Sequence, residues 1–198
     1  MPFEAFVTLV VLSFASAFTP GPNNALVASS AVNFGMRRTL PHVFGIALGF
    51  PVMALAVGLV LGEVFEASAA LRAGLRWGGG ALMLWVAWQI ATKGGLGPEG
   101  GRPRPFRFIE AEAFQWINPK AWIVAIALTA QFIPPERPQG AALVVAAVFV
   151  AAGLASALTW AGTGQALRRI LARPARLRLF NATMGGVIAI GVAFVLAG

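Results

Sequence analysis

The chain has 198 residues, of which 58% are hydrophobic and only 11% are charged. Its mean hydropathy of +0.78 is higher than a water-soluble globular domain of this length normally reaches. The sequence contains no cysteine, which excludes disulfides, iron–sulfur clusters and thiol redox chemistry. These values predict an integral membrane protein.

Six apolar windows are long enough to cross the bilayer, since a helix rises about 1.5 Å per residue and the hydrocarbon core is about 30 Å thick. The windows are rich in Ala, Leu and Gly and lack sustained alternation, which favours helices over barrel strands. The sequence therefore predicts an all-α fold with six transmembrane helices. The windows lie near residues 3–30, 41–62, 74–92, 109–133, 139–164 and 180–197.

The net charge of +8 does not indicate a nucleic-acid partner, because the basic residues lie at the edges of the apolar windows. Clusters follow the first, third and fifth windows, and few basic residues fall on the opposite side. The positive-inside rule places these clusters in the cytoplasm, so we expect a multi-pass protein with both termini outside the cytoplasm.

The Gly- and Pro-rich stretch 93-KGGLGPEGGRPRPFR-107 divides the chain into two halves. We expect three helices in residues 1–92, a cytoplasmic loop at 93–108, and three helices in residues 109–198. An odd number of spans per half inverts the second half relative to the first, as in the inverted repeats of transporters. The alternative to an inverted repeat is that the prolines in the first windows of the two halves correspond only by chance.

Within the second window, Gly45 and Gly49 have the spacing that lets helices pack closely.

The stretch 19-TPGPNN-24 interrupts the first window. Pro20 and Pro22 each remove a backbone donor, so the helix must break or kink, and in hydrocarbon the freed groups must line a cavity or meet polar partners. Pro22 is suited to start a new half-helix, whose N–H groups favour a carboxylate. A binding site that uses Pro20, Gly21, Pro22, Asn23 and Asn24 is favoured over a simple packing kink.

Asn118, Pro119 and Lys120 interrupt the fourth window in the same way. An ammonium within an apolar span needs an anion, which makes Lys120 a functional candidate. The alternative is that Lys120 reaches the interface.

Glu112, Trp116 and Lys120 recur at i, i+4 and i+8 and therefore share one helix face. Glu112 is expected either to take part in the site or to complement the helix dipole, and Glu110 to do only the latter. Gln131 is a further polar candidate, and Gln115 is expected to form an interhelical hydrogen bond.

An enzyme is not expected, because the chain has one histidine and neither aspartate nor cysteine. Metal sites built on His, Asp or Cys cannot be assembled from these residue types, and no cofactor is expected. The histidine, His42, is expected at a membrane interface.

Three stretches resemble the LysE-type (LysE/RhtB) superfamily of bacterial amino-acid exporters. The sequence of the first stretch is similar to that of the branch of neutral amino-acid and cysteine/O-acetylserine exporters. The family's Pro-Gly-Pro-Asn motif falls on Pro20–Asn23 and its Asn-Pro-Lys motif on Asn118–Lys120, whereas its Pro-Gln-Phe is here Ala130-Gln131-Phe132. The stretches are 20-PGPNNALVASSAVNFGMRRTLPHVFGIALGF-50, 114-FQWINPKAWIVAIALTAQFIP-134 and 180-FNATMGG-186.

The resemblance implies a protein of the bacterial inner membrane that exports amino acids, is driven by an ion gradient, typically of protons, and acts as a homo-oligomer among membrane lipids. We therefore expect an exporter of a small zwitterionic amino acid built from two inverted three-helix repeats with broken first and fourth helices. The alternatives are a non-transporting membrane scaffold or partner subunit, and a channel-like pathway.

Overall fold

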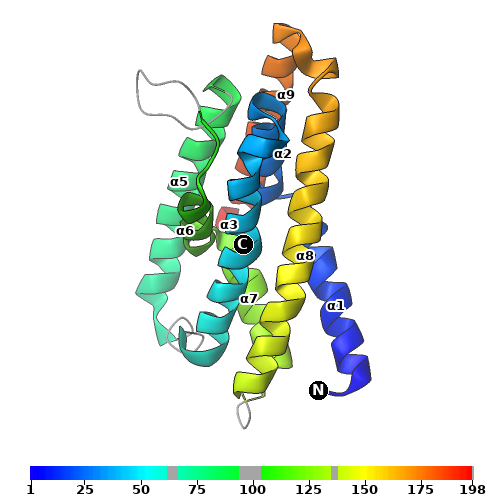
Figure 1. Ribbon diagram of the computed structural model, residues 1–198. Coiled ribbons are helices and arrows are strands. Elements are labelled where there is room, and N and C mark those ends of the chain that lie inside the picture. The colour runs from blue at the N-terminus through cyan, green and yellow to red at the C-terminus, as the bar shows by residue number, and fades with distance from the viewer. Residues whose placement is uncertain (62–66, 94–103, 135–137, 198) are drawn as a thin grey trace.

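A computed structural model of the chain describes residues 1–61, 67–93, 104–134 and 138–197. This part of the chain is all-helical (Figure 1). The α-helices are α1 (Phe3–Phe18), α2 (Pro22–Phe34), α3 (Met36–Ala56), α5 (Ala69–Lys93), α6 (Phe108–Ile117), α7 (Pro119–Phe132), α8 (Pro138–Leu167) and α9 (Pro174–Ala197). A π-helical turn, η1 (Val57–Leu61), extends α3, and a 3-10 turn, η2 (Ile170–Ala172), precedes α9.

Proline determines where the first apolar window breaks. α1 ends at Phe18, and α2 starts with Pro22 as its first residue, a position where the missing N–H has no intrahelical partner to lose. The two helices are bent by 54° relative to each other. The predicted break in the first helix is confirmed.

The fourth window breaks in the same manner. α6 ends at Ile117, Asn118 has an extended backbone, and α7 starts with Pro119. Figure 1 shows α1 and α7 in the half of the molecule that holds the N-terminus, whereas α2 lies toward the other end.

Three helical segments in the described part of the chain are long and apolar enough to cross a membrane, namely Met36–Val60, Pro138–Leu167 and Pro174–Phe194. The bent pair α1–α2 adds a fourth if it counts as one span. Four of the six predicted windows thus qualify by length and composition. The other two correspond to α5, which contains arginine, glutamine and a run of glycines, and to α6–α7, which contains two glutamates and a lysine.

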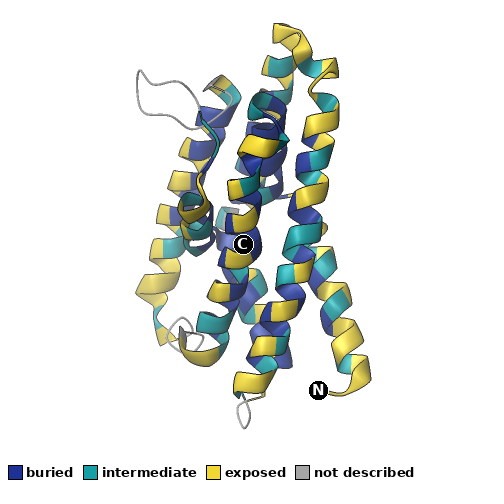
Figure 2. Ribbon diagram, in the orientation of Figure 1, coloured by how far each residue is buried: buried dark blue, intermediate teal, exposed yellow. Residues whose placement is uncertain are grey.

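Close helix packing forms the core. α3 packs along α8, α5 packs along α9, and α2 lies against α8. Buried side chains such as Val27, Val43 and Ile188 face inward, while exposed residues lie on the outer faces of the bundle (Figure 2). A methyl group at Gly45 would come within 2.4 Å of the Phe108 carbonyl oxygen, so the predicted close approach at this glycine is confirmed.

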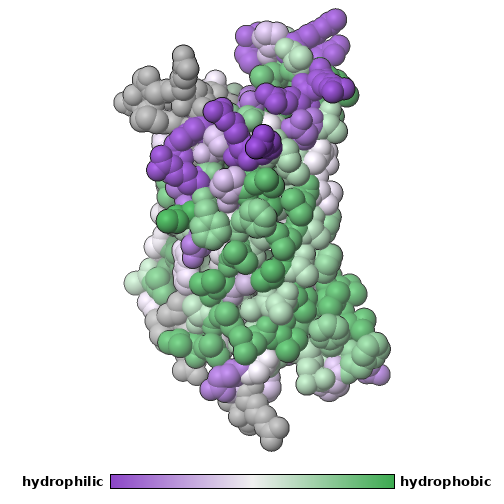
Figure 3. Space-filling model, in the orientation of Figure 1, coloured by the Kyte–Doolittle hydropathy of each residue, from purple (hydrophilic) through white to green (hydrophobic). Residues whose placement is uncertain are grey.

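Polarity separates along the long axis of the molecule. Figure 3 shows hydrophobic side chains over much of the bundle and hydrophilic ones gathered at the end where α8 turns into α9. Away from this end, the Arg76 side chain of α5 donates a hydrogen bond to the Leu196 carbonyl near the end of α9. The C-terminal end of α9 therefore lies beside the start of α5.

Candidate functional site

The break between α1 and α2 exposes backbone carbonyls that a continuous helix would have paired. In a helix the Ser16 carbonyl accepts from the N–H of the residue four positions on, but that residue is Pro20. The chain then leaves the helix, so the Ala17 and Thr19 carbonyls also lack their usual partners. Apolar surroundings make such unpaired groups costly, so other groups must supply donors.

Three side chains supply these donors. The Asn24 amide nitrogen donates to the carbonyl oxygens of Ala17 and Thr19, both at 3.0 Å. The Ser156 hydroxyl of α8 donates to the same Ala17 carbonyl at 2.7 Å. The third donor is the ammonium group of Lys120.

Lys120 connects the two broken spans. Its ammonium nitrogen lies 3.1 Å from the Ser16 carbonyl oxygen and 2.8 Å from that of Thr19. Gly21 leaves room for this approach, because a methyl group there would lie 3.2 Å from the ammonium nitrogen and Lys120 would have to shift by a few tenths of an ångström. In the described ranges no carboxylate lies within ion-pair distance of Lys120. The positive charge is therefore met by backbone carbonyls at the end of α1, where the helix dipole is negative.

The second break is satisfied more locally. The Asn118 side-chain oxygen accepts from the Lys120 backbone N–H at 3.1 Å and so caps α7. The Trp116 carbonyl, which loses its helical partner at the break, accepts from the Trp122 indole N–H at 2.8 Å. The backbone at this break is held by residues of the same broken span.

Asn23 and Gln115 form a second link between the broken spans. The Asn23 amide nitrogen donates to the Gln115 side-chain oxygen at 2.8 Å, and Gln115 is fully buried. The Gln115 amide nitrogen also donates to the Ala111 carbonyl of its own helix at 2.8 Å, which fixes its orientation. The predicted interhelical hydrogen bond of Gln115 is confirmed.

These groups border a cavity of about 80 Å³. One water needs about 10–15 Å³ of such volume, so the cavity has room for about five to eight water-sized groups, which suits a small amino acid. The polar wall consists of Ser16, Asn23, Asn24, Asn118, Lys120 and Ser156. The apolar wall includes Ile46, Phe50, Val124, Phe149 and Ala157.

Most of the residues predicted for the site lie at this cavity. Gly21, Pro22, Asn23, Asn24, Asn118 and Lys120 line it, and Pro20 and Pro119 are next to lining residues in the chain. Two predicted residues lie elsewhere: Glu112 packs against Gly49 of α3, and Gln131 is exposed on α7.

The proposed shared face of Glu112, Trp116 and Lys120 is wrong, because the helix ends at Ile117 and Lys120 belongs to α7. Among the described residues, the carboxylate of Glu112 has no hydrogen-bond or ion-pair partner.

Sequence reasoning missed Ser156 and the aromatic pair of the apolar wall. Ser156 is buried in α8, and Phe50 and Phe149 pack with ring centroids 4.6 Å apart. Ser156 and Phe149 lie in no segment with an unusual pattern, and Phe50 closes the first stretch that resembles the family but was not singled out there. A buried serine in a long apolar helix is the one signal that points to Ser156, and many such serines only bond to their own helix.

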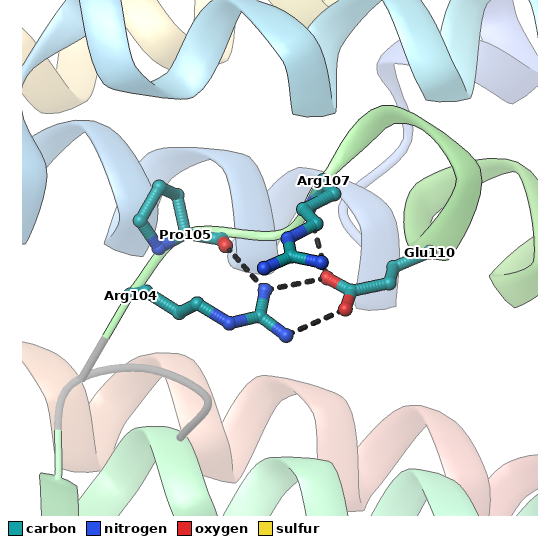
Figure 4. A network of polar contacts seen from close by, with 4 residues as sticks. All are labelled: Arg104, Pro105, Arg107 and Glu110. Carbon is teal, nitrogen blue, oxygen red and sulfur yellow. Dashed lines mark hydrogen bonds and ion pairs between the residues drawn. The ribbon is translucent and has the colours of Figure 1, made fainter. Parts of the chain in front are cut away.

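Glu110 lies outside the cavity, at the start of α6 (Figure 4). It accepts from the two terminal guanidinium nitrogens of Arg104, at 2.7 and 2.6 Å, and from the Arg107 backbone N–H at 2.9 Å. The hydrogen bonds to Glu110 raise the pKa of Arg104 above its usual range. The interpretation of Glu110 as a residue that serves the helix N-terminus is confirmed.

His42 does not lie at a helix start, although its expected place at a membrane interface rests on such a position. Its side chain is buried and stacks on Phe106, with ring centroids 4.9 Å apart. α3 begins at Met36 and continues through Pro41, so His42 lies within the helix instead of at its start.

Several of the helices are long and apolar enough to cross a membrane. Between the helices of the bundle lies a small cavity whose polar wall is formed mainly by the backbone and side chains of two broken helices. In the described part of the chain no three His or Glu side chains gather as metal ligands. Discontinuous helices whose broken ends line a binding site are typical of many secondary transporters. The fold and the site thus define a multi-pass membrane protein with the architecture of a carrier.

Comparison with known proteins identifies the family. The family model described as LysE type translocator matches residues 14–198. The chain belongs to this family and is a transporter, not an enzyme.

Several curated relatives are cysteine/O-acetylserine efflux proteins. That of Klebsiella pneumoniae is 31% identical over 170 residues, which cover 84% of each chain. That of Escherichia coli K12 is 31% identical over 169 residues, again 84% of each chain. The protein of Salmonella typhimurium is 33% identical over 136 residues, or 69% of this chain and 68% of the relative. No solved structure matches the chain.

Proposed function

We propose that this protein is a secondary active exporter of small amino acids or their derivatives across the bacterial cytoplasmic membrane, coupled to protons. The names of the relatives, cysteine/O-acetylserine efflux proteins, support this substrate class. The observation that carries the proposal is the contact of Lys120 with the freed carbonyls of α1 at a cavity of amino-acid size.

The two walls of the cavity suit the two ends of an amino acid. Lys120 and the first N–H groups of α2, at Asn23 and Asn24, would hold the carboxylate, because a helix N-terminus carries a partial positive charge. The carbonyl oxygens at the end of α1 would hold the ammonium. The wall with Phe50 and Phe149 would take a small side chain.

Alternating access would come from two inverted repeats, residues 1–92 and 109–198. Each contains one broken span followed by two helices, which makes α3 the counterpart of α8 and α5 that of α9. Counterparts related by a two-fold axis pack on each other where they meet that axis. The close packing of α3 on α8 and of α5 on α9 supports this arrangement, in which one repeat rocks against the other around the cavity.

The test is counterflow of radiolabelled amino acids, including cysteine and O-acetylserine, into proteoliposomes. We expect saturable exchange by the wild-type protein and a loss of at least about tenfold in Lys120→Met, since removal of one charge-assisted interaction costs about 1.4 kcal/mol or more. Lys93→Met, which replaces the other lysine at the end of α5, is the matched control and should behave like the wild type.

Each alternative to the exporter gives a different result. A scaffold or partner subunit would show no flux in either protein despite correct insertion. A channel-like pathway would show flux that does not saturate with amino acid. For proton coupling, an imposed pH gradient should drive amino-acid accumulation above the equilibrium level, and accumulation that ignores the gradient would contradict it.

A further inference from the structure

We infer that the cavity binds its substrate by inserting a zwitterion between the Lys120 ammonium and the carbonyl oxygens at the end of α1. The site would then select molecules that carry an ammonium and a carboxylate together. This inference rests on the proposed function, because it defines the substrate class of the same cavity.

In the structure, Lys120 occupies the carbonyl oxygens that a substrate ammonium would bind. Any ammonium that binds the Ser16 and Thr19 carbonyl oxygens competes with Lys120, whose nitrogen lies 3.1 and 2.8 Å from them. Thr19 has a second donor in Asn24, at 3.0 Å. Ser16 depends on Lys120, because Pro20 removes the N–H that would otherwise reach it.

The charge of Lys120 is the second feature of the site. Its only hydrogen-bond acceptors in the described part of the chain are the two carbonyls, and no carboxylate there pairs with it. A ligand carboxylate would therefore gain an ammonium that the protein has not neutralised with a carboxylate. Such an ion pair is strong in surroundings of low polarity, provided that the groups left behind are satisfied.

The dependence of the Ser16 carbonyl on Lys120 and the positive charge of Lys120 together disfavour ligands with only one charged group. A simple carboxylate would draw Lys120 away and leave the Ser16 carbonyl without a donor, which apolar surroundings make costly. A simple amine would displace Lys120 and leave its ammonium unpaired, which is also costly. A zwitterion satisfies both, since its carboxylate receives Lys120 and its ammonium replaces Lys120 at the carbonyls. It also leaves the net charge of the cavity unchanged.

A matched set of three compounds tests this selectivity. L-cysteine has both groups, 3-mercaptopropionate lacks the ammonium, and cysteamine lacks the carboxylate. The measurements are inhibition of radiolabelled L-cysteine counterflow and direct binding of radiolabelled L-cysteine and cysteamine to purified protein under reducing conditions. For the wild type we expect both analogues to compete at least about 100-fold more weakly than cysteine, because each leaves a polar group of the cavity wall unpaired.

The variant Lys120→Met should lose the preference for cysteine over cysteamine. Without the lysine, the Ser16 carbonyl is available and no ammonium is left unpaired, so cysteamine should bind at least about as tightly as cysteine. Lys120→Arg keeps the charge and should keep the preference for the zwitterion. Lys93→Met should match the wild type, and an unchanged elution profile in detergent would show that each variant is folded.

The outcomes separate this inference from the proposed function. If wild-type protein exchanges cysteine and either analogue competes as well as cysteine does, zwitterion insertion is wrong while the exporter proposal stands. If Lys120→Met is folded and still rejects cysteamine, the role of Lys120 at the carbonyls is wrong. If the wild type neither exchanges nor binds cysteine, both proposals are contradicted for this substrate.

Discussion

Asn24 and Ser156 satisfy the broken backbone together. Both donate to the Ala17 carbonyl, at 3.0 and 2.7 Å, so this oxygen keeps one donor when either side chain is removed. Thr19 is protected in the same way by Asn24 and Lys120. Shared donors of this kind make the stability effects of substitutions non-additive.

The double variant of Asn24→Ala and Ser156→Ala should be destabilised by more than the sum of its single variants. Each single variant loses hydrogen bonds worth about 0.5–1.5 kcal/mol, but only the double variant leaves the Ala17 carbonyl unpaired. The free energy of unfolding in mixed micelles, followed by tryptophan fluorescence, measures this. Thr159→Ala removes an exposed hydroxyl that bonds within α8 and is the control. Strict additivity would show that the two donors do not share this carbonyl.

At the scale of elements, glycines set how closely the helices pack. A methyl group at Gly185 of α9 would come within 2.6 Å of the Ala87 carbonyl oxygen on α5. A methyl group at the next residue, Gly186, would meet no neighbouring atom within 4 Å. The two neighbouring glycines thus differ in packing alone.

Gly185→Ala should lower stability by about 1–3 kcal/mol, because the added methyl forces α9 away from α5. Gly186→Ala should leave stability unchanged or raise it by up to about 1 kcal/mol, because alanine favours the helix. Melting temperatures in one detergent provide the comparison. Equal shifts for both variants would contradict the packing of α9 on α5.

The sequence was sufficient to locate the broken elements but not their partners. Pro20, Pro22 and Pro119 predicted both breaks, because a missing backbone donor acts locally. Ser156 could not be predicted as a partner of Ala17, since the two residues meet only through the packing of α1 on α8. The expected face shared by Glu112 and Lys120 failed for the opposite reason: a local helix period was extended across a break.

For the whole molecule, the charge distribution predicts an orientation in the membrane. The basic clusters follow the first, third and fifth windows, and hydrophilic side chains gather at the end where α8 turns into α9 (Figure 3). Apolar length predicted six spans, and four of them qualify by length and composition in the described part of the chain. The windows of α5 and α6–α7 do not, because polar and small residues lower their hydropathy. The positive-inside rule places the basic end in the cytoplasm.

We therefore expect both termini outside the cytoplasm. Alkaline phosphatase fused after Gly198 should be active, because this enzyme folds only outside the cytoplasm. Green fluorescent protein fused there should be dark, because it does not become fluorescent when it is exported unfolded. Fusions placed after Arg173, in the turn before α9, should give the reverse result and serve as the control. Green fluorescence of the Gly198 fusion would show that the C-terminus lies in the cytoplasm and would contradict the predicted topology.

The most direct test of the central claim is substrate protection of a single cysteine in the cavity. Because the chain has no cysteine, Val124→Cys at the cavity wall provides one reactive thiol, and Ile170→Cys, 59% exposed in η2, provides a control outside the cavity. The rate of modification by a charged methanethiosulfonate is measured with increasing O-acetylserine or serine, whichever shows counterflow.

The account predicts that the amino acid slows modification at Val124→Cys by about tenfold at ten times its dissociation constant. The rate at Ile170→Cys should not change. Modification of Val124→Cys that is unaffected by an amino acid the same variant transports would contradict a substrate site between the broken helices.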